Sequence, residues 1–158
     1  MNKLFTAAAA IAFAGFATAA HAAPAGNTSN SVALNGTVAT TCSIDVKALN
    51  PALDLVNGEK ATAVAEITET CNSGKGYDVS FSSANDGTLV SEADGTAPAA
   101  YTVAYDGETG DLAQSDWKVS RDVAGFGKKA TLAVSIDAHP EAIGGDYADT
   151  ITVQIAAK

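Results

Sequence analysis

Apolar and polar residues alternate at every second position along much of this chain. The clearest alternating stretches lie at residues 32–38, 78–82, 101–105, 131–136 and 150–155. Alternation with a period of two is what a β-strand with one buried face requires, because successive side chains point to opposite faces. Helical periodicity is nearly absent. The sequence therefore predicts an all-β protein built from half-buried strands.

Residues 62–71 form a sixth predicted strand with a less regular pattern. The apolar residues of one face are Ala63, Ala65, Ile67 and Cys71. The charged Glu69 falls on that same face, where a carboxylate is costly to bury without a partner. We expect Glu69 to lie near a strand end, or a β-bulge to precede it.

Turn-forming residues separate the predicted strands. Glycine, asparagine and aspartate supply the backbone conformations of tight turns. The turn signals are Asn57-Gly58, Gly74-Lys75-Gly76, Asn85-Asp86-Gly87, Asp94-Gly95, Asp106-Gly107 and Gly144-Gly145. Short alternating strands joined in this way are typical of an antiparallel β-sandwich.

The first 22 residues have the three-part pattern of a cleavable secretory signal. Lys3 provides a positive start, residues 4–20 carry no charge, and Ala20-His21-Ala22 has small residues at the two positions that signal peptidase reads. A membrane anchor is the alternative, but the apolar stretch is short and rich in alanine. We expect cleavage after Ala22, which leaves 136 of the 158 residues as one exported domain without a membrane anchor.

The charge of the exported part excludes some partners. Removing the signal removes Lys3, and eight basic residues then face 18 acidic ones, a formal charge of −10. Nucleic acid and anionic lipid both require a basic surface, so neither is expected as a partner. Mutual repulsion between such chains favours solubility.

Two cysteines, Cys42 and Cys71, follow the signal. In an oxidising compartment they are expected to form one disulfide. A metal site is a poor alternative, because no paired ligand spacing links them to His139. No metal and no cofactor is expected.

No catalytic set can be assembled from the sequence, so the chain is not expected to be an enzyme. It contains no G-x-S-x-G and no S-x-x-K motif. His139 precedes Pro140 in a turn-like segment and is expected to be a surface residue. The carboxylates of residues 106–111 lie among glycine and threonine, lack the spacing of an EF-hand loop, and are expected in solvated turns.

Three motifs in order carry a family resemblance. The pattern V-x-L-x-G-x-V-x-x-x-C-x-I covers residues 32–44, a strand containing Cys71 follows, and G-D-Y-A-D-T-I-T-V-x-I covers residues 145–155. With these motifs the chain resembles pilin subunits of the chaperone–usher pathway. It is most similar to the spore coat protein U family and the related archaic pilus subunits.

The resemblance implies an incomplete immunoglobulin-like antiparallel β-sandwich that lacks its final strand. It implies a signal at residues 1–22, an N-terminal extension with a donor strand at residues 23–41, and a pilin-like domain at residues 42–158. The implied donor residues are Val32, Leu34, Gly36 and Val38. The implied acceptor-groove residues are Ile151, Val153 and Ile155.

The resemblance also implies a function. A periplasmic chaperone would cover the groove, and an outer-membrane usher would then replace it with the donor strand of the next subunit. The product would be a pilus or fimbrium on the cell surface, with adhesion and biofilm formation as its roles. Two alternatives stay open: residues 32–38 could be the first strand of a complete sandwich, or the protein could be a secreted module that binds carbohydrate or another surface ligand without polymerising.

Overall fold

The computed structural model describes residues 26, 29–113 and 116–158. The predicted signal at residues 1–22 lies outside the described residues. The described part contains strands and turns but no helix, and hence no helix that could cross a membrane. The chain divides into two compact units, residues 1–36 and residues 37–158, and all the strands belong to the second.

Nine strands are present in the described residues. They are β1 (Cys42–Ala48), β2 (Glu59–Cys71), β3 (Tyr77–Ser83), β4 (Thr88–Leu89), β5 (Ala99–Tyr105), β6 (Glu108–Gly110), β7 (Trp117–Arg121), β8 (Gly125–Ile136) and β9 (Ile151–Ala157).

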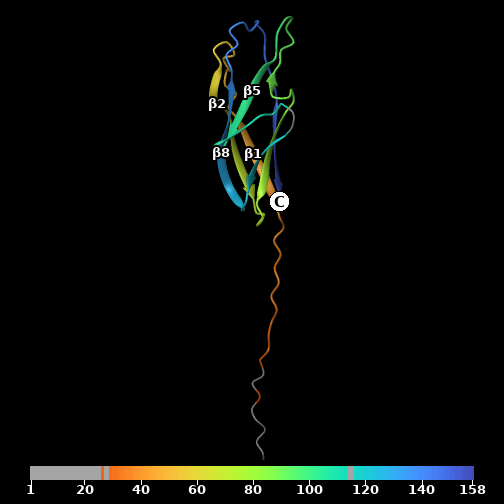
Figure 1. Ribbon diagram of the computed structural model, residues 1–158. Helices are drawn as coiled ribbons and strands as arrows, with labels where there is room; N and C mark the ends of the chain where they lie inside the picture. The colour runs from red at the N-terminus through yellow and green to blue at the C-terminus, as the bar shows by residue number, and fades with distance from the viewer. Residues whose placement is uncertain (1–25, 27–28, 114–115) are drawn as a thin grey trace, which may run out of the picture. The chain divides into compact units, whose positions relative to one another are not determined.

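Antiparallel pairing arranges these strands in two sheets. One sheet has the order β1-β2-β8-β5-β4, with β6 also paired to β5, and the other has the order β7-β3-β9. The two sheets pack face to face (Figure 1). The protein is thus an all-β, immunoglobulin-like sandwich with one disulfide, as the sequence predicts.

Alternate residues of the central strands form the core between the sheets. Fully buried side chains come from β2, β3, β5, β7 and β8, and the largest apolar ones are Ile67, Tyr77, Val79, Phe81, Val103, Tyr105 and Val119. Burying a side chain of this size stabilises the fold by about 1.5–3 kcal/mol. The period-two pattern of the sequence is therefore the pattern of the core.

The predicted strand at residues 32–38 is not formed. Residues 29–41 contain neither helix nor strand, and β1 begins only at Cys42. Val32, Leu34 and Val38 are 84%, 91% and 85% exposed. The alternative that residues 32–38 are the first strand of a complete sandwich is therefore wrong for this structure.

A bulge changes the face assignment in β2. Ala63 pairs with Ala133, whereas Ala65 pairs with Leu132, the next residue on the opposite face of β8. The prediction that Ala63 shares a face with Ala65 is therefore wrong, because a bulge inserts an extra residue between them. Glu69 lies two residues before the end of β2, as expected, and the register shift next to it follows it rather than precedes it.

The turn between β5 and β6 follows the predicted chemistry. Asp106 and Gly107 have φ angles of +52° and +86°. Positive φ at both central residues is the requirement of a two-residue type I′ hairpin, and Asp-Gly meets it with little strain. This turn brings Asp106 next to β7 and β8, where it takes part in the polar cluster described below.

Candidate functional site

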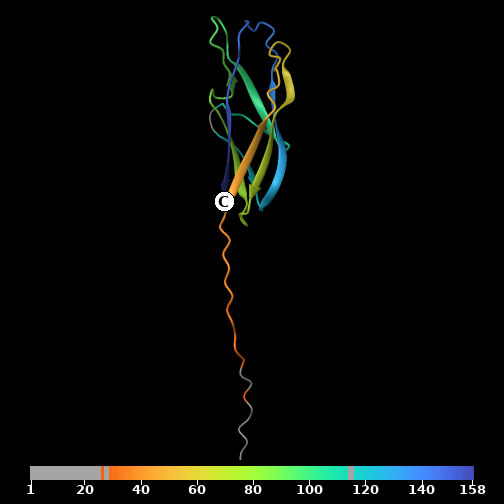
Figure 2. The same cartoon turned by 180° about the vertical axis from the view of Figure 1, so that it is seen from behind.

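One long side of the sandwich has two strands without outer partners. β9 pairs with β3 and β1 pairs with β2, and among the described residues neither has a second strand neighbour. β1 and β9 belong to different sheets but lie next to each other along this side, as the two opposite views show (Figures 1 and 2). We call the side between them the open edge.

The apolar face of β9 lines the open edge. Ile151, Val153 and Ile155 pack against the core yet remain partly exposed, while the intervening Thr152 and Gln154 are fully exposed. From β1, Ile44 and Cys42 contact the core in the same partly buried way. The structure therefore brings the three predicted groove residues together on one face.

A cavity of about 370 Å³ opens at the Ile151 end of β9. Its apolar lining includes Leu53, Val64, Leu89, Val134, Ile136 and Ile151. Sequence reasoning did not find it, because the lining comes from five strands and two loops that are distant in the chain. The cavity extends the open edge into the core between the sheets.

A polar cluster anchors the beginning of β9 beside this cavity. Asp149 accepts hydrogen bonds from the hydroxyls of Tyr101 and Ser83, both at 2.6 Å, and from the backbone N–H of Asn85 at 3.1 Å. Burial and the bond to Asp149 raise the pKa of Tyr101, so the phenol stays protonated and donates. The cluster fixes where β9 starts relative to β3 and β5.

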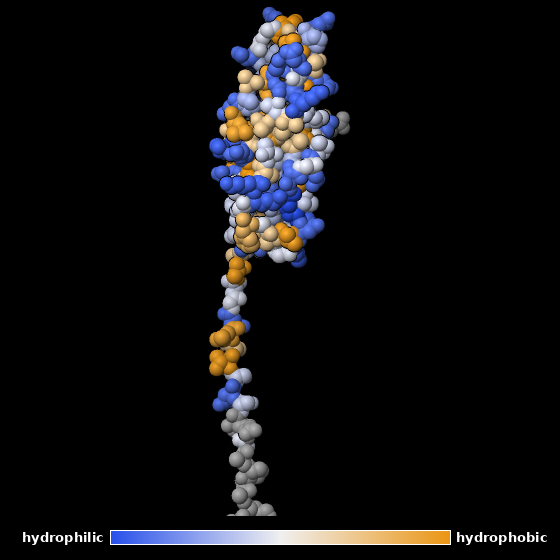
Figure 3. Space-filling model, turned by 90° about the vertical axis from the view of Figure 1, so that its left-hand side faces the viewer, coloured by the Kyte–Doolittle hydropathy of each residue, from blue (hydrophilic) through white to orange (hydrophobic). Residues whose placement is uncertain are grey.

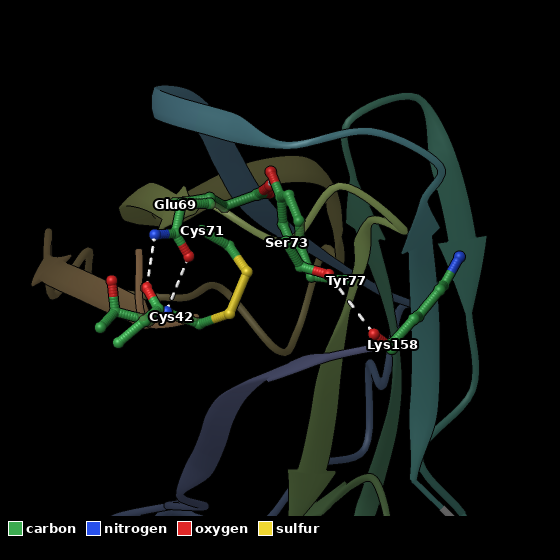
Figure 4. The surroundings of a disulfide bond; sticks show 9 residues. Cys42, Glu69, Cys71, Ser73, Tyr77 and Lys158 are labelled. Carbon is green, nitrogen blue, oxygen red and sulfur yellow. Dashed lines mark hydrogen bonds between the residues drawn. A yellow bond between two sulfur atoms is a disulfide. The ribbon is translucent and has the colours of Figure 1, made fainter. Parts of the chain in front are cut away.

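The predicted disulfide between Cys42 and Cys71 is present and links β1 to β2 (Figure 4). The two cysteines lie opposite each other in the antiparallel register of these strands. The bond therefore attaches one wall of the open edge covalently to the sandwich. Near it, the hydroxyl of Ser73 donates to the carbonyl of Lys158 at 3.3 Å, which joins the end of β9 to the same region.

Asn72 holds the residues that precede β1. Its backbone N–H donates to the carbonyl of Thr41 at 3.1 Å, and its Nδ2 donates to the carbonyl of Ala39 at 2.8 Å. Its Oδ1 accepts from the backbone N–H of Thr41 at 2.7 Å. Residues 39–41 are thus fixed beside the end of β2 although they form no strand.

The predicted donor residues are exposed in this structure. Gly36 has no atom within 4 Å of the position a Cβ would take. The segment before β1 carries apolar side chains on its surface, interrupted by polar ones (Figure 3). Val32, Leu34 and Gly36 belong to the first unit and Val38 to the second.

Sequence reasoning missed a buried ion pair. Glu69 is 0% exposed and accepts hydrogen bonds from Arg121 Nε and Nη2 at 3.1 and 2.9 Å, from the Tyr77 hydroxyl at 2.6 Å, and from the Tyr105 hydroxyl. Arg121 also contacts Asp106 at 2.9 Å. The sequence did contain a signal for this pair. Glu69 falls on the apolar face of its strand, where a carboxylate needs a cationic partner, and Arg121 is the only arginine of the sequence.

The electrostatics of this cluster favour a structural role. Burial alone would raise the pKa of Glu69, but the hydrogen bonds from Arg121, Tyr105 and Tyr77 outweigh it and the pKa is lowered. Burial and the bond to Glu69 raise the pKa of Tyr77 to about 12. The carboxylate is ionised, fully hydrogen-bonded and closed to solvent, so it is not available as a general base.

No group of three or more potential metal ligands is present among residues 29–113 and 116–158. His139 is not the plain surface residue that the sequence predicts. Its ring is partly buried, its backbone N–H donates to the carbonyl of Leu55 at 2.8 Å, and its Nε2 has no hydrogen-bond partner within the described part of the chain.

No protein-family model and no curated protein matches this sequence significantly. Among solved structures, the chain is similar to HdaB, the minor tip subunit of the E. coli Hda pilus. The two share 11% identity with a TM-score of 0.43, over 72% of this chain and 79% of HdaB. A likeness this weak shows neither the family nor the function of this chain.

Proposed function

We propose that this chain is a structural subunit of a surface fibre whose copies are joined by strand donation. Residues 32–38 of one copy enter the open edge between β1 and β9 of the next. The observation that carries the proposal is that one chain contains both a strand edge without a partner and an alternating segment that could pair with it. One strand, β9, has a partly exposed apolar face and a free edge, and another segment has the alternation of a strand but no partner.

The physical fit is that of strand addition to a sheet edge. Main-chain hydrogen bonds along β9 would supply affinity, and alternate side chains would enter the apolar edge. Val32 and Leu34 are two residues apart, as are Ile151 and Val153, so the spacings match. Gly36 lets the donor backbone approach closely where no side chain fits. Large apolar residues that are 84–91% exposed, such as Val32 and Leu34, would then lose their contact with water.

Such donation produces a fibre rather than a closed oligomer. Donor and acceptor are different surfaces, so each added copy presents a new acceptor and the contact does not close on itself. In this proposal the chain is exported by its signal, a periplasmic chaperone covers the open edge in transit, and an outer-membrane usher exchanges the chaperone for the donor strand. The chain would be an archaic, spore coat protein U-like pilin with a role in adhesion and no catalytic activity.

The test is to delete residues 23–38 from the exported chain and to supply the donor segment as a separate peptide. We expect a folded domain that forms no fibres but binds a synthetic peptide of residues 29–41 and melts at a higher temperature when the peptide is bound. The matched control peptide carries Leu34→Asp, which places a charge on the apolar face. Normal fibre formation by the shortened chain, or equal binding of both peptides, would contradict the proposal.

A further inference from the structure

The sandwich has two ends with opposite surface chemistry. The end at which β1 begins and β9 finishes includes residues 72–76, residues 122–128 and Lys158, and we call it the proximal pole. The opposite end includes residues 49–60, 91–98 and 137–147, and we call the last two segments the distal pole. The segments 72–76, 91–98, 122–128 and 137–147 lie outside β1 and β9, so strand donation does not explain their features.

The proximal pole carries exposed apolar side chains among basic ones. Phe126 and Val123 are 74% and 70% exposed, well above the other exposed large apolar residues of the strand-bearing unit except Val38. Isolated soluble domains seldom expose neighbouring apolar residues to this degree without a partner. Of its lysines, Lys128 forms an ion pair with Asp106 and Lys158 forms ion pairs with Asp78 and Asp122, so the exposed Lys75 is the cation of this pole for which the described residues show no ion pair.

The distal pole is hollowed and acidic. A cavity of about 400 Å³ is lined by Leu55, Ala97, Pro140, Ile143 and Tyr147, beside the unpaired Nε2 of His139. Residues 91–98 and 137–147 contain no lysine or arginine. Their acidic residues are Glu92, Asp94, Asp137, Glu141 and Asp146.

The short connection between donor strand and sandwich limits where two joined copies can meet. Asn72 holds residues 39–41 at the proximal pole, and only four residue steps separate Val38 from Cys42. Four residues span at most about 14 Å. The proximal pole of a donating copy must therefore lie close to whichever end of the open edge receives Val38.

Two orientations of the donor strand give opposite contacts. If it runs antiparallel to β9, Val38 lies near Ile151, and the proximal pole of the donor meets the acidic, hollowed distal pole of the acceptor. If it runs parallel, Val38 lies near Ala157, and two proximal poles with two exposed phenylalanines meet instead. A cavity that faces an exposed aromatic side chain favours the antiparallel arrangement.

We propose a second contact between copies, in which the proximal pole of one docks on the distal pole of the copy that receives its strand. Phe126 and Val123 pack at the cavity beside Ile143, and Lys75 faces the acidic residues. This inference rests on the proposed function, because strand donation brings the two poles together. The pole contact would limit the rotation of one copy relative to the next and so make the fibre stiffer.

Cysteine cross-linking tests the contact in assembled fibres. The exported chain carrying Phe126→Cys and Ile143→Cys should form disulfide-linked ladders on oxidation, seen in denaturing gels without reductant. The matched control combines Phe126→Cys with Thr102→Cys, because Thr102 is exposed in the middle of β5, and it should give no ladder. Normal fibres from the first variant without a ladder would overturn the pole contact.

A charge exchange completes the test. Lys75→Glu should slow polymerisation and Glu141→Lys in the same chain should restore it, because both residues are exposed, one on each pole. Failure of the second change to restore the rate would also overturn the pole contact. If the shortened chain binds the donor peptide while these tests fail, strand donation stands and only the pole contact falls.

Discussion

The two long sides of the sandwich are closed in different ways. On the side of β5 and β7, the chain itself crosses between the sheets, and Leu112 of that crossing is 3% exposed. Trp117 packs on Phe81 there, with ring centroids 5.2 Å apart. On the side of β1 and β9, no described segment crosses, and Ile151, Val153 and Ile155 stay partly exposed.

The difference shows how a domain can be stable although two of its strands have free edges on one side. The closed side combines apolar packing with the buried pair of Glu69 and Arg121, which ties β2 to β7. At the open edge, β1 and β9 pair on one side only, with β2 and β3, and the disulfide of Cys42 and the hydrogen bonds to Asp149 fix opposite ends of this edge. A side paired in this way leaves main-chain groups of β9 free to pair with a further strand.

The largest effect is expected from breaking the closed side at its ion pair. Glu69→Ala leaves Arg121 buried without its main partner and should lower the free energy of unfolding by about 3–5 kcal/mol. Urea denaturation measures the change. Glu66→Ala is the control, because its pair with Lys47 is exposed and should contribute little. Similar losses in the two variants would show that the buried cluster is not what stabilises this side.

Opening the disulfide weakens the wall of the open edge. Replacing Cys42 and Cys71 together by serine should cost about 3.6 kcal/mol, from the greater freedom of a 29-residue separation in the unfolded chain. Because β1 is an edge strand held otherwise only by β2, binding of the donor peptide should weaken as well. An unchanged melting temperature would contradict the first expectation, and unchanged peptide affinity the second.

Truncations on the two sides compare them directly. Leu112→Ala removes a buried side chain and should cost about 2–5 kcal/mol, whereas Ile155→Ala removes a partly exposed one and should cost about 1 kcal/mol. With the donor peptide bound, Ile155→Ala should lower the free energy of unfolding by more than it does without peptide, whereas the loss caused by Leu112→Ala should stay the same. Thermal unfolding of both variants with and without peptide measures this, and an equal response would remove the distinction between the sides.

Of the four changes, lowering the pH should have the smallest effect on the free energy of unfolding, and this effect should arise at the closed side. The pKa of Glu69 in the fold is lowered from its ordinary value of 4.5, so the unfolded chain takes up the proton more readily. The stabilisation is complete at neutral pH and is lost as pH falls below 4.5 towards the lowered pKa. Unfolding followed between pH 7 and pH 3 should show a steeper loss for the native chain than for Glu69→Gln, and parallel curves would refute it.

Much of the fold could be predicted from local pattern. The alternation of Tyr101, Val103 and Tyr105 predicted β5 correctly, and Asp106-Gly107 predicted the turn that follows it. β7 and the first half of β8 were not predicted, because residues such as Lys128 and Lys129 interrupt the apolar alternation where one face is exposed to solvent.

The candidate site also has one part that the sequence predicted and one part that it did not. The apolar face of β9 was visible in the sequence, since alternation identifies a face. The cavity beside Ile151 was not, because its lining is assembled from strands that are distant in sequence.

The sequence by itself determined an all-β fold, one cysteine pair, and an alternating apolar segment ahead of the first cysteine. Only the tertiary structure decided that this segment stays unpaired, that β1 and β9 have free edges on the same side, and that Glu69 meets Arg121 in the core. The physical reason is the separation along the chain of the residues that interact. Alternation and turn chemistry act between neighbouring residues, whereas strand order and the partner of a buried charge depend on contacts between residues up to 85 positions apart, such as Ser73 and Lys158.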